Sequence, residues 1–123
     1  MPRELSDRSL ALKVAATCEQ KKAADVSILD VSKRTFITGY FVICTSESPR
    51  QSRAIAEAAE QELKALGHRM LGHEGYEDGE WLLADFGDVV LHVFSPELRR
   101  FYAIESIWSD AKRVKPAVAR AKK

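Results

Sequence analysis

The sequence has few of the features that mark membrane, metal-binding or disulfide-stabilised proteins. Its 123 residues include two cysteines, Cys18 and Cys44, in apolar segments; two are too few for a four-cysteine zinc site, and we expect buried free thiols. The longest apolar run, Tyr40 to Cys44, is far shorter than the ~20 residues that span a bilayer. The first residues do not resemble a signal peptide. We therefore expect one globular domain in the cytoplasm, with no membrane partner.

Motifs for the common catalytic and cofactor sites are also absent. The three histidines are scattered, and there is no HExxH, GxSxG, Walker or GxGxxG motif. A two-metal site needs converging carboxylates, but Glu60/Glu62 fall on a predicted helix and Asp78/Glu80 in a turn. The sequence therefore predicts no cofactor, no metal and no enzyme.

The formal net charge of +1 conceals a strong segregation of charge. Residues 111–123 contain six bases and no acid, so the other 110 residues carry −5. Between Met70 and Leu98 there are seven acids and no Lys or Arg. Such a segment attracts a basic partner; the alternative is a solvated acidic loop. We expect a folded domain over residues 1–113 and a disordered basic tail over 114–123.

Three helices are predicted from periodicity and capping residues. Apolar spacing predicts a helix from Ser6 or Asp7 to about residue 22. Ser48, followed by proline and by a glutamine at the third helical position, forms a capping box that opens a second helix ending before Gly67. A third helix starts at Ser95 and continues without interruption to Ala111.

Strands fill the intervening segments. Residues 26–31 are rich in β-branched side chains, and residues 39–45 are almost wholly apolar, which is typical of a central strand. Residues 81–86 and 89–94 flank Gly87-Asp88, which predicts a β-hairpin with a type II′ turn. The fold class is therefore α/β: a single domain with a mixed β-sheet flanked by helices.

The hairpin register divides its side chains between two faces. The wholly apolar face must point to the core: Leu82, Ala84, Phe86, Val89, Leu91 and Val93. The other face carries Trp81, Leu83, Asp85, Val90, His92 and Phe94. It is either a protein-recognition surface, because aromatic side chains ringed by acids suit a basic partner, or a helix-covered face with Asp85 and His92 paired beneath. Tyr102 and Glu105, three apart on the last helix, extend this surface if that helix packs beside the hairpin.

Four segments carry a recognisable pattern: KKAADVSILDVS (residues 21–32), YFVICTSESPRQSRAIA (40–56), HEGYEDGEWLLADFGDVVLHVF (73–94) and RRFYAIESIW (99–108). In this order they resemble the Iojap-like ribosomal silencing factors, over roughly residues 5 to 113. The family pattern is matched at Trp81, Asp85, Gly87, Asp88, His92, Phe94, Arg99, Tyr102, Glu105 and Trp108. Two positions depart from it: Gly39 stands where an acid is usual, and Ser46 where glycine is common.

The resemblance implies a nucleotidyltransferase-like fold without catalytic carboxylates. It implies a translational repressor that binds the large ribosomal subunit through ribosomal protein L-fourteen and sterically blocks joining of the small subunit under nutrient limitation. The residues that it implies for partner binding are Trp81, Asp85, Asp88, His92, Phe94, Arg99, Tyr102 and Glu105.

Other functions stay open on the sequence alone. A nucleotidyltransferase-like, metal-dependent enzyme would hold Mg²⁺ with Asp78, Glu80 or Asp85. In a third possibility, the basic tail would bind ribosomal RNA directly. An uncovered strand, or the apolar side of the last helix, would form the interface of a homodimer.

Overall fold

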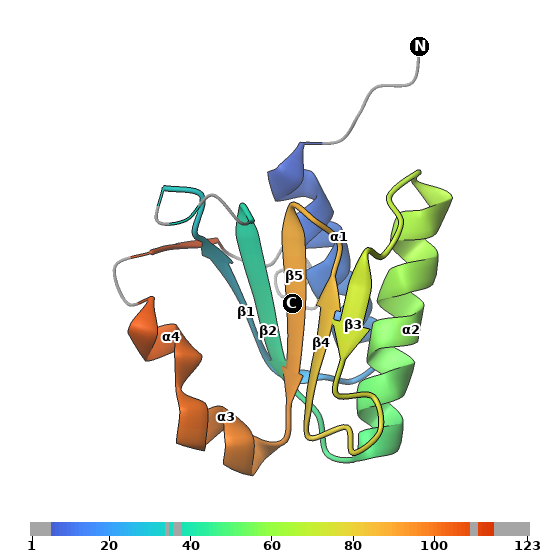
Figure 1. Ribbon diagram of the computed structural model, residues 1–123, viewed down its shortest axis with the longest axis vertical. Coiled ribbons are helices and arrows are strands. Elements are labelled where there is room, and N and C mark those ends of the chain that lie inside the picture. The colour runs from blue at the N-terminus through green and yellow to red at the C-terminus, as the bar shows by residue number, and fades with distance from the viewer. Residues whose placement is uncertain (1–5, 34, 36–37, 109–110, 115–123) are drawn as a thin grey trace.

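The computed structural model describes residues 6–33, 35, 38–108 and 111–114, which form a mixed sheet with helices on both faces (Figure 1). The elements are α1 (Asp7–Gln20), β1 (Ala24–Asp30), β2 (Tyr40–Thr45), α2 (Pro49–Ala65), β3 (Gly72–Glu74), β4 (Trp81–Asp85), β5 (Val89–Phe94), α3 (Pro96–Tyr102), α4 (Ile104–Ile107) and β6 (Lys112–Val114). The strand order is β3-β4-β5-β2-β1-β6. β2 and β5 are parallel and the other neighbours are antiparallel. The predicted α/β class and the central position of β2 are confirmed.

One face of the sheet is covered by α1 and α2, and the main core lies between these helices and the sheet (Figure 1). Both cysteines lie in this core as free, buried thiols, as expected. The predicted start of α2 is confirmed: Ser48 Oγ accepts a hydrogen bond from the Gln51 amide, 3.0 Å away. The glutamine side chain, however, accepts from the Glu47 amide at 2.7 Å. The cap therefore extends one residue further back than the capping box predicts.

The predicted β4–β5 hairpin has the predicted register, from Trp81 opposite Phe94 to Asp85 opposite Val90. The Phe86 amide donates to the Val89 carbonyl at 2.9 Å, and Gly87 has φ +91°, which fits the first central position of a type II′ turn. The wholly apolar face of the hairpin lies in the main core, as predicted.

The prediction of one continuous last helix to Ala111 is wrong. Ala103 adopts a left-handed conformation (φ 45°, ψ 47°) and separates α3 from α4. In a straight helix, residues 99 and 105 would lie about 9 Å apart along the axis and on different sides. The bend brings Arg99 and Glu105 to 2.8 Å and buries Ile104, and these contacts offset the roughly 1–2 kcal/mol that a left-handed alanine costs.

A short strand that the sequence did not predict, β6, forms the edge of the sheet next to β1. β6 pairs antiparallel with β1, and Val114 is 5% exposed. The remainder of the predicted basic tail, residues 115–123, lies outside the described residues.

Candidate functional site

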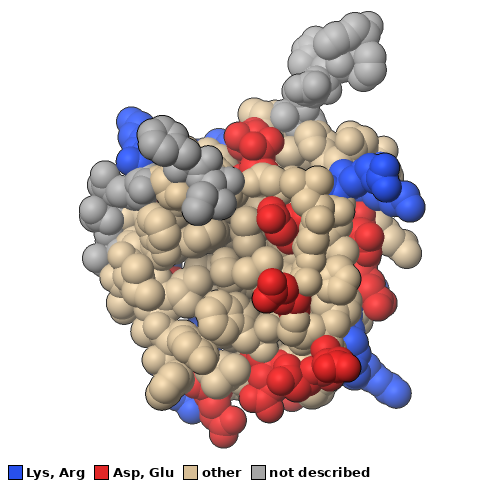
Figure 2. Space-filling model, in the orientation of Figure 1, with Lys and Arg blue, Asp and Glu red and all other residues tan. Residues whose placement is uncertain are grey.

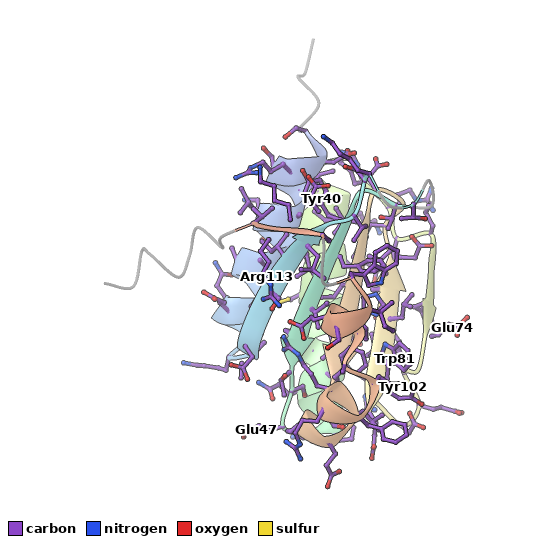
Figure 3. All side chains as sticks on the ribbon, turned by 90° about the vertical axis from the view of Figure 1, so that its left-hand side faces the viewer. Tyr40, Glu47, Glu74, Trp81, Tyr102 and Arg113 are labelled. Carbon is purple, nitrogen blue, oxygen red and sulfur yellow. The ribbon has the colours of Figure 1, made fainter. Side chains whose placement is uncertain are left out.

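A groove of about 430 Å³ runs between α3 and the start of β4. It is lined by Glu74, Gly75, Asp78, Glu80, Trp81, Leu83, Leu98 and Tyr102. These residues come from β3, the loop that follows it, β4 and α3. Figure 3 shows Trp81 and Tyr102 close together, with Glu74 at the same edge of the molecule and Arg113 away from them. We call this feature the acidic groove.

Trp81 and Tyr102 form the aromatic wall of the acidic groove, and Trp81 packs on buried side chains beneath it. The rings of Trp81 and Tyr102 have centroids 4.7 Å apart, and Trp81 also packs on Phe94 at 4.9 Å. The Trp81 indole N–H donates to His92 Nδ1 at 3.2 Å. Because Nδ1 accepts this bond, neutral His92 carries its proton on Nε2. Burial lowers the pKa of His92 to about 4, so the imidazole is neutral at pH 7 and stays an acceptor for the indole.

The rim of the groove has one sign of charge. Among the described residues that line it, Glu74, Asp78 and Glu80 are exposed acids and none is Lys or Arg. Figure 2 shows the same asymmetry: acidic side chains run down this face, while basic side chains lie at its margins. Carboxylates beside the rings of Trp81 and Tyr102 form a site for a cationic, partly apolar surface.

The turn between β3 and β4 is shaped by a close backbone contact at Gly75. This residue has φ +82°, and a Cβ there would lie 2.0 Å from the Trp81 carbonyl oxygen. Only glycine allows this approach. The contact holds Gly75, one of the residues that line the groove, against the first residue of β4.

The structure brings Trp81 and Tyr102 together but places the other predicted contact residues elsewhere. Asp85 lies at the opposite end of β4, where its Oδ1 accepts from the Gly87 amide at 2.8 Å. Asp88 is exposed in the hairpin turn, and its carbonyl accepts from the Gly39 and Tyr40 amides. These two acids therefore lie apart from the groove, at the other end of the hairpin.

The acid that the family pattern usually has at position 39 is absent here, but the carboxylate of Asp7 lies near Gly39. A Cβ on Gly39 would lie 3.4 Å from Asp7 Oδ2, so the start of α1 brings a carboxylate to this position. Burial, and then the charge and hydrogen bond of Asp88, raise the pKa of Asp7. The hairpin end thus carries a pair of neighbouring carboxyl groups, from Asp7 and Asp88.

His92 and Phe94 lie beneath the aromatic wall, 5% and 0% exposed. Phe94 belongs with Trp81 to the layer of side chains that α3 and α4 cover, and the His92 ring stacks on Phe94 with centroids 6.1 Å apart. Asp85 and His92 bond different partners, so the buried pair that we considered for a covered face does not form. These two aromatic residues support the groove and do not form its surface.

Arg99 and Glu105 form an ion pair, and both line a second hollow outside the acidic groove. Arg99 Nη2 lies 2.8 Å from Glu105 Oε2, with side chains 14% and 21% exposed. Burial tends to raise the pKa of Glu105, but hydrogen bonds from Arg99 and Ser27 and the charges of Arg99 and Arg113 outweigh it and lower the pKa. This pair joins α4 to α3 and, through Ser27, to β1.

The carboxylates proposed for an Mg²⁺ site do not converge. Glu80 precedes β4 and Asp85 ends it, and five strand residues span about 16 Å. Within the described ranges, no group of three or more His, Cys, Asp or Glu side chains is placed to hold a metal ion.

Several groove residues were missed as contact residues: Glu74 and Leu98 were not singled out, and Asp78 and Glu80 were considered only as metal ligands. The run of acids without a base between Met70 and Leu98 pointed to the acidic rim. Nothing in the sequence placed that loop against α3, because the two meet only through the fold.

Comparison with known proteins identifies the family. The model of the family "Ribosomal silencing factor during starvation" matches residues 4–123. The chain belongs to this family of ribosomal silencing factors. It is 35% identical over 107 residues to Ribosomal silencing factor RsfS of Bacillus subtilis, covering 87% of this chain and 91% of that protein. It is 32% identical over 106 residues to chloroplastic Iojap of Zea mays, covering 84% of this chain and 45% of that protein. The predicted resemblance is confirmed.

A solved structure of the same fold supports this assignment. A crystal structure of a Chromobacterium violaceum protein superposes with a TM-score of 0.83 at 34% identity, covering 92% of this chain and 93% of that chain. As a ribosomal silencing factor, the protein is a translation regulator associated with the ribosome. Of the helices in the described residues, none has the length and apolarity needed to cross a membrane.

Proposed function

We propose that this ribosomal silencing factor binds the large ribosomal subunit through ribosomal protein L-fourteen and sterically blocks joining of the small subunit when nutrients are limiting. The observation that carries the proposal is the acidic groove: three exposed carboxylates beside the rings of Trp81 and Tyr102, with no base among the described lining residues. A basic protein surface complements this arrangement in charge, and aromatic side chains anchor it by burial.

The proposed residue roles follow from the geometry. Trp81 and Tyr102 contact the partner directly, and His92 and Phe94 hold the indole in place. Asp85 and Asp88 pair with Lys or Arg of the partner at the other end of the hairpin. Arg99 and Glu105 act on binding by fixing α3 against the sheet.

The mechanism is steric and needs no catalytic step, metal or cofactor, and it operates in the cytoplasm. The competing proposal, a metal-dependent nucleotidyltransferase, predicts heat of binding when Mg²⁺ and nucleoside triphosphates are titrated into the protein. Isothermal titration calorimetry separates the two, since a docking module gives no heat. Light scattering on the same sample reports whether the homodimer considered above forms.

Co-sedimentation with purified large subunits tests the docking surface. The groove variant Asp78→Lys/Glu80→Lys/Tyr102→Ala changes exposed side chains and should lose binding while keeping the wild-type unfolding transition. The matched control is Glu47→Lys/Glu57→Lys, which reverses two exposed acids outside the groove and gives the same change in net charge. Equal loss in both variants, or retention in the groove variant, would contradict the proposed surface.

A further inference from the structure

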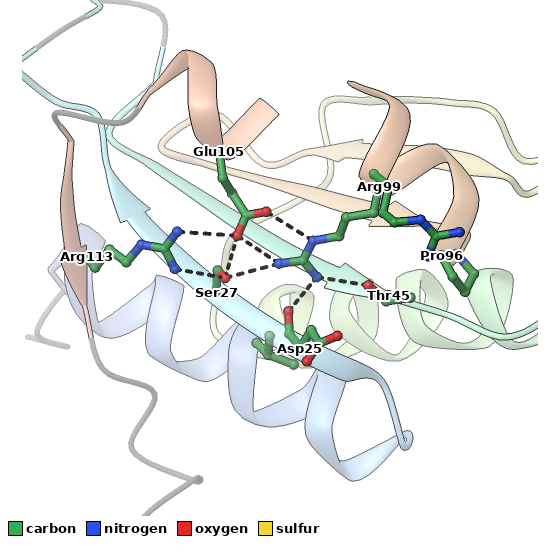
Figure 4. A pocket seen from close by; sticks show the side chains of 9 residues that line it. Asp25, Ser27, Thr45, Pro96, Arg99, Glu105 and Arg113 are labelled. Atoms are coloured by element: carbon green, nitrogen blue, oxygen red, sulfur yellow. Dashed lines mark hydrogen bonds and ion pairs between the residues drawn. The ribbon is translucent and has the colours of Figure 1, made fainter. Parts of the chain in front are cut away.

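A second hollow, of about 470 Å³, lies on the other side of α3 from the acidic groove. It is lined by Asp25, Val26, Ser27, Thr45, Pro96, Arg99, Arg100, Glu105 and Arg113 (Figure 4). We call it the arginine pocket. Three arginines from α3 and β6 are among its lining residues, whereas the acidic groove has none among the described residues.

Arg99 forms the fixed part of this pocket. Its guanidinium donates to Glu105, Ser27, Thr45 and the Asp25 carbonyl. These bonds use its donors and neutralise Glu105 at 2.8 Å. Arg99 and Glu105 therefore build the wall of the pocket and contribute little net charge to a ligand.

Arg100 and Arg113 provide the available positive charge. The Arg113 side chain is 63% exposed, and its contacts are long: 3.7 Å to Glu105 and 3.5 Å to Ser27 Oγ. Arg100 is exposed, and no hydrogen bond or ion pair to it is formed within the described residues. With Glu105 neutralised by Arg99, the other two lining arginines outnumber the one remaining lining acid, Asp25. The lining therefore carries a net positive charge and favours an anion, and guanidinium groups suit phosphate oxygens.

The surrounding charge favours a polyanion over a small anion. Lys112 is exposed next to Arg113, and four further bases, Lys115, Arg120, Lys122 and Lys123, follow β6 in the sequence. A chain of phosphates would engage such a run of bases, whereas one free phosphate needs only the pocket.

We infer that the arginine pocket is a binding site for the phosphodiester backbone of RNA, with Arg100 and Arg113 as its contact residues. The inference rests on the proposed function, because the large subunit offers RNA beside its proteins. α3 then carries a site on each side: Leu98 and Tyr102 line the groove for a basic protein, and Arg99 and Arg100 line the pocket for RNA.

The test measures fluorescence anisotropy of a fluorescein-labelled RNA hairpin titrated with the full chain at several salt concentrations. Arg100→Glu/Arg113→Glu should weaken binding about tenfold or more and make the salt dependence shallower by about 1 to 2 phosphate contacts. The matched control, Arg50→Glu/Arg69→Glu, removes two exposed arginines outside the pocket with the same change in net charge. It should lose less than about threefold.

Four results would overturn the inference. They are equal effects of the two arginine variants, unchanged binding in the pocket variant, loss of binding only when residues 115–123 are deleted, and displacement of the RNA by polyglutamate as effective as by unlabelled RNA. The groove variant, which changes charge outside the pocket, should bind the RNA hairpin within about threefold of the wild type. A failure of the pocket is therefore distinct from a failure of the groove, which is measured on large subunits.

Discussion

At the scale of single residues, His92 couples the stability of the fold to pH. Burial lowers its pKa from 6.5 to about 4. Between these values the unfolded chain binds a proton that the folded chain does not, so stability is lost as pH falls from about 6.5 to 4. The loss from this residue is about 3 kcal/mol at the lower end. Protonation also removes the acceptor for the Trp81 indole.

Urea unfolding of the wild type and of His92→Gln at pH 7, 5.5 and 4 measures this effect. The variant keeps a hydrogen-bond acceptor and lacks the titrating group, so its stability should fall less over this range. Parallel pH profiles for the two proteins would show that His92 does not titrate as its burial requires.

Also at this scale, the lining of the groove depends on Gly75, where the close backbone contact leaves no room for a side chain. Gly75→Ala would place a Cβ 2.0 Å from the Trp81 carbonyl oxygen at a residue with positive φ. We expect a loss of about 2–3 kcal/mol and weaker binding to large subunits. Gly72→Ala, three residues away and with no atom within 4 Å of the added Cβ, should change stability by less than about 0.5 kcal/mol. Thermal unfolding of both variants tests this; similar losses would contradict it.

At the scale of elements, the bend between α3 and α4 depends on Glu105. Glu105→Gln removes the charge that neutralises Arg99, which is only 14% exposed, and should cost about 2 kcal/mol. Glu97→Gln, on the exposed first turn of α3, should cost about 0.5 kcal/mol or less. Urea unfolding at pH 7 compares them. If Glu105→Gln is no more harmful than Glu97→Gln, the ion pair does not hold the bend.

The same elements show what the sequence could and could not predict. The hairpin register and the start of α2 follow from residues within a few positions of each other, namely Gly87-Asp88 and Ser48 with Gln51. The bend at Ala103 depends on Ser27, which lies 78 positions from Glu105 and 72 from Arg99. No local pattern reports such contacts. β6 could not be predicted for the same reason, because its strand conformation depends on pairing with β1, which is distant in the sequence.

At the scale of the whole molecule, the net charge of +1 conceals two sites of opposite charge on either side of α3. The acidic groove and the arginine pocket are separated by one short helix, so a protein and an RNA of the same subunit could be engaged together. This arrangement refines the sequence-based prediction, in which the tail alone was the RNA contact. It also refines the site, since the predicted contact residues divide between the groove, the buried layer beneath it, the hairpin end and the arginine pocket.

The most direct test of the account is a subunit-joining assay followed by light scattering with purified small and large subunits. Wild-type protein, added to large subunits before small subunits, should suppress the rise in scattering in proportion to its occupancy. The groove variant Asp78→Lys/Glu80→Lys/Tyr102→Ala should leave joining unaffected, while Glu47→Lys/Glu57→Lys should suppress it like the wild type. Full suppression by the groove variant, or normal joining with saturating wild-type protein, would contradict the account.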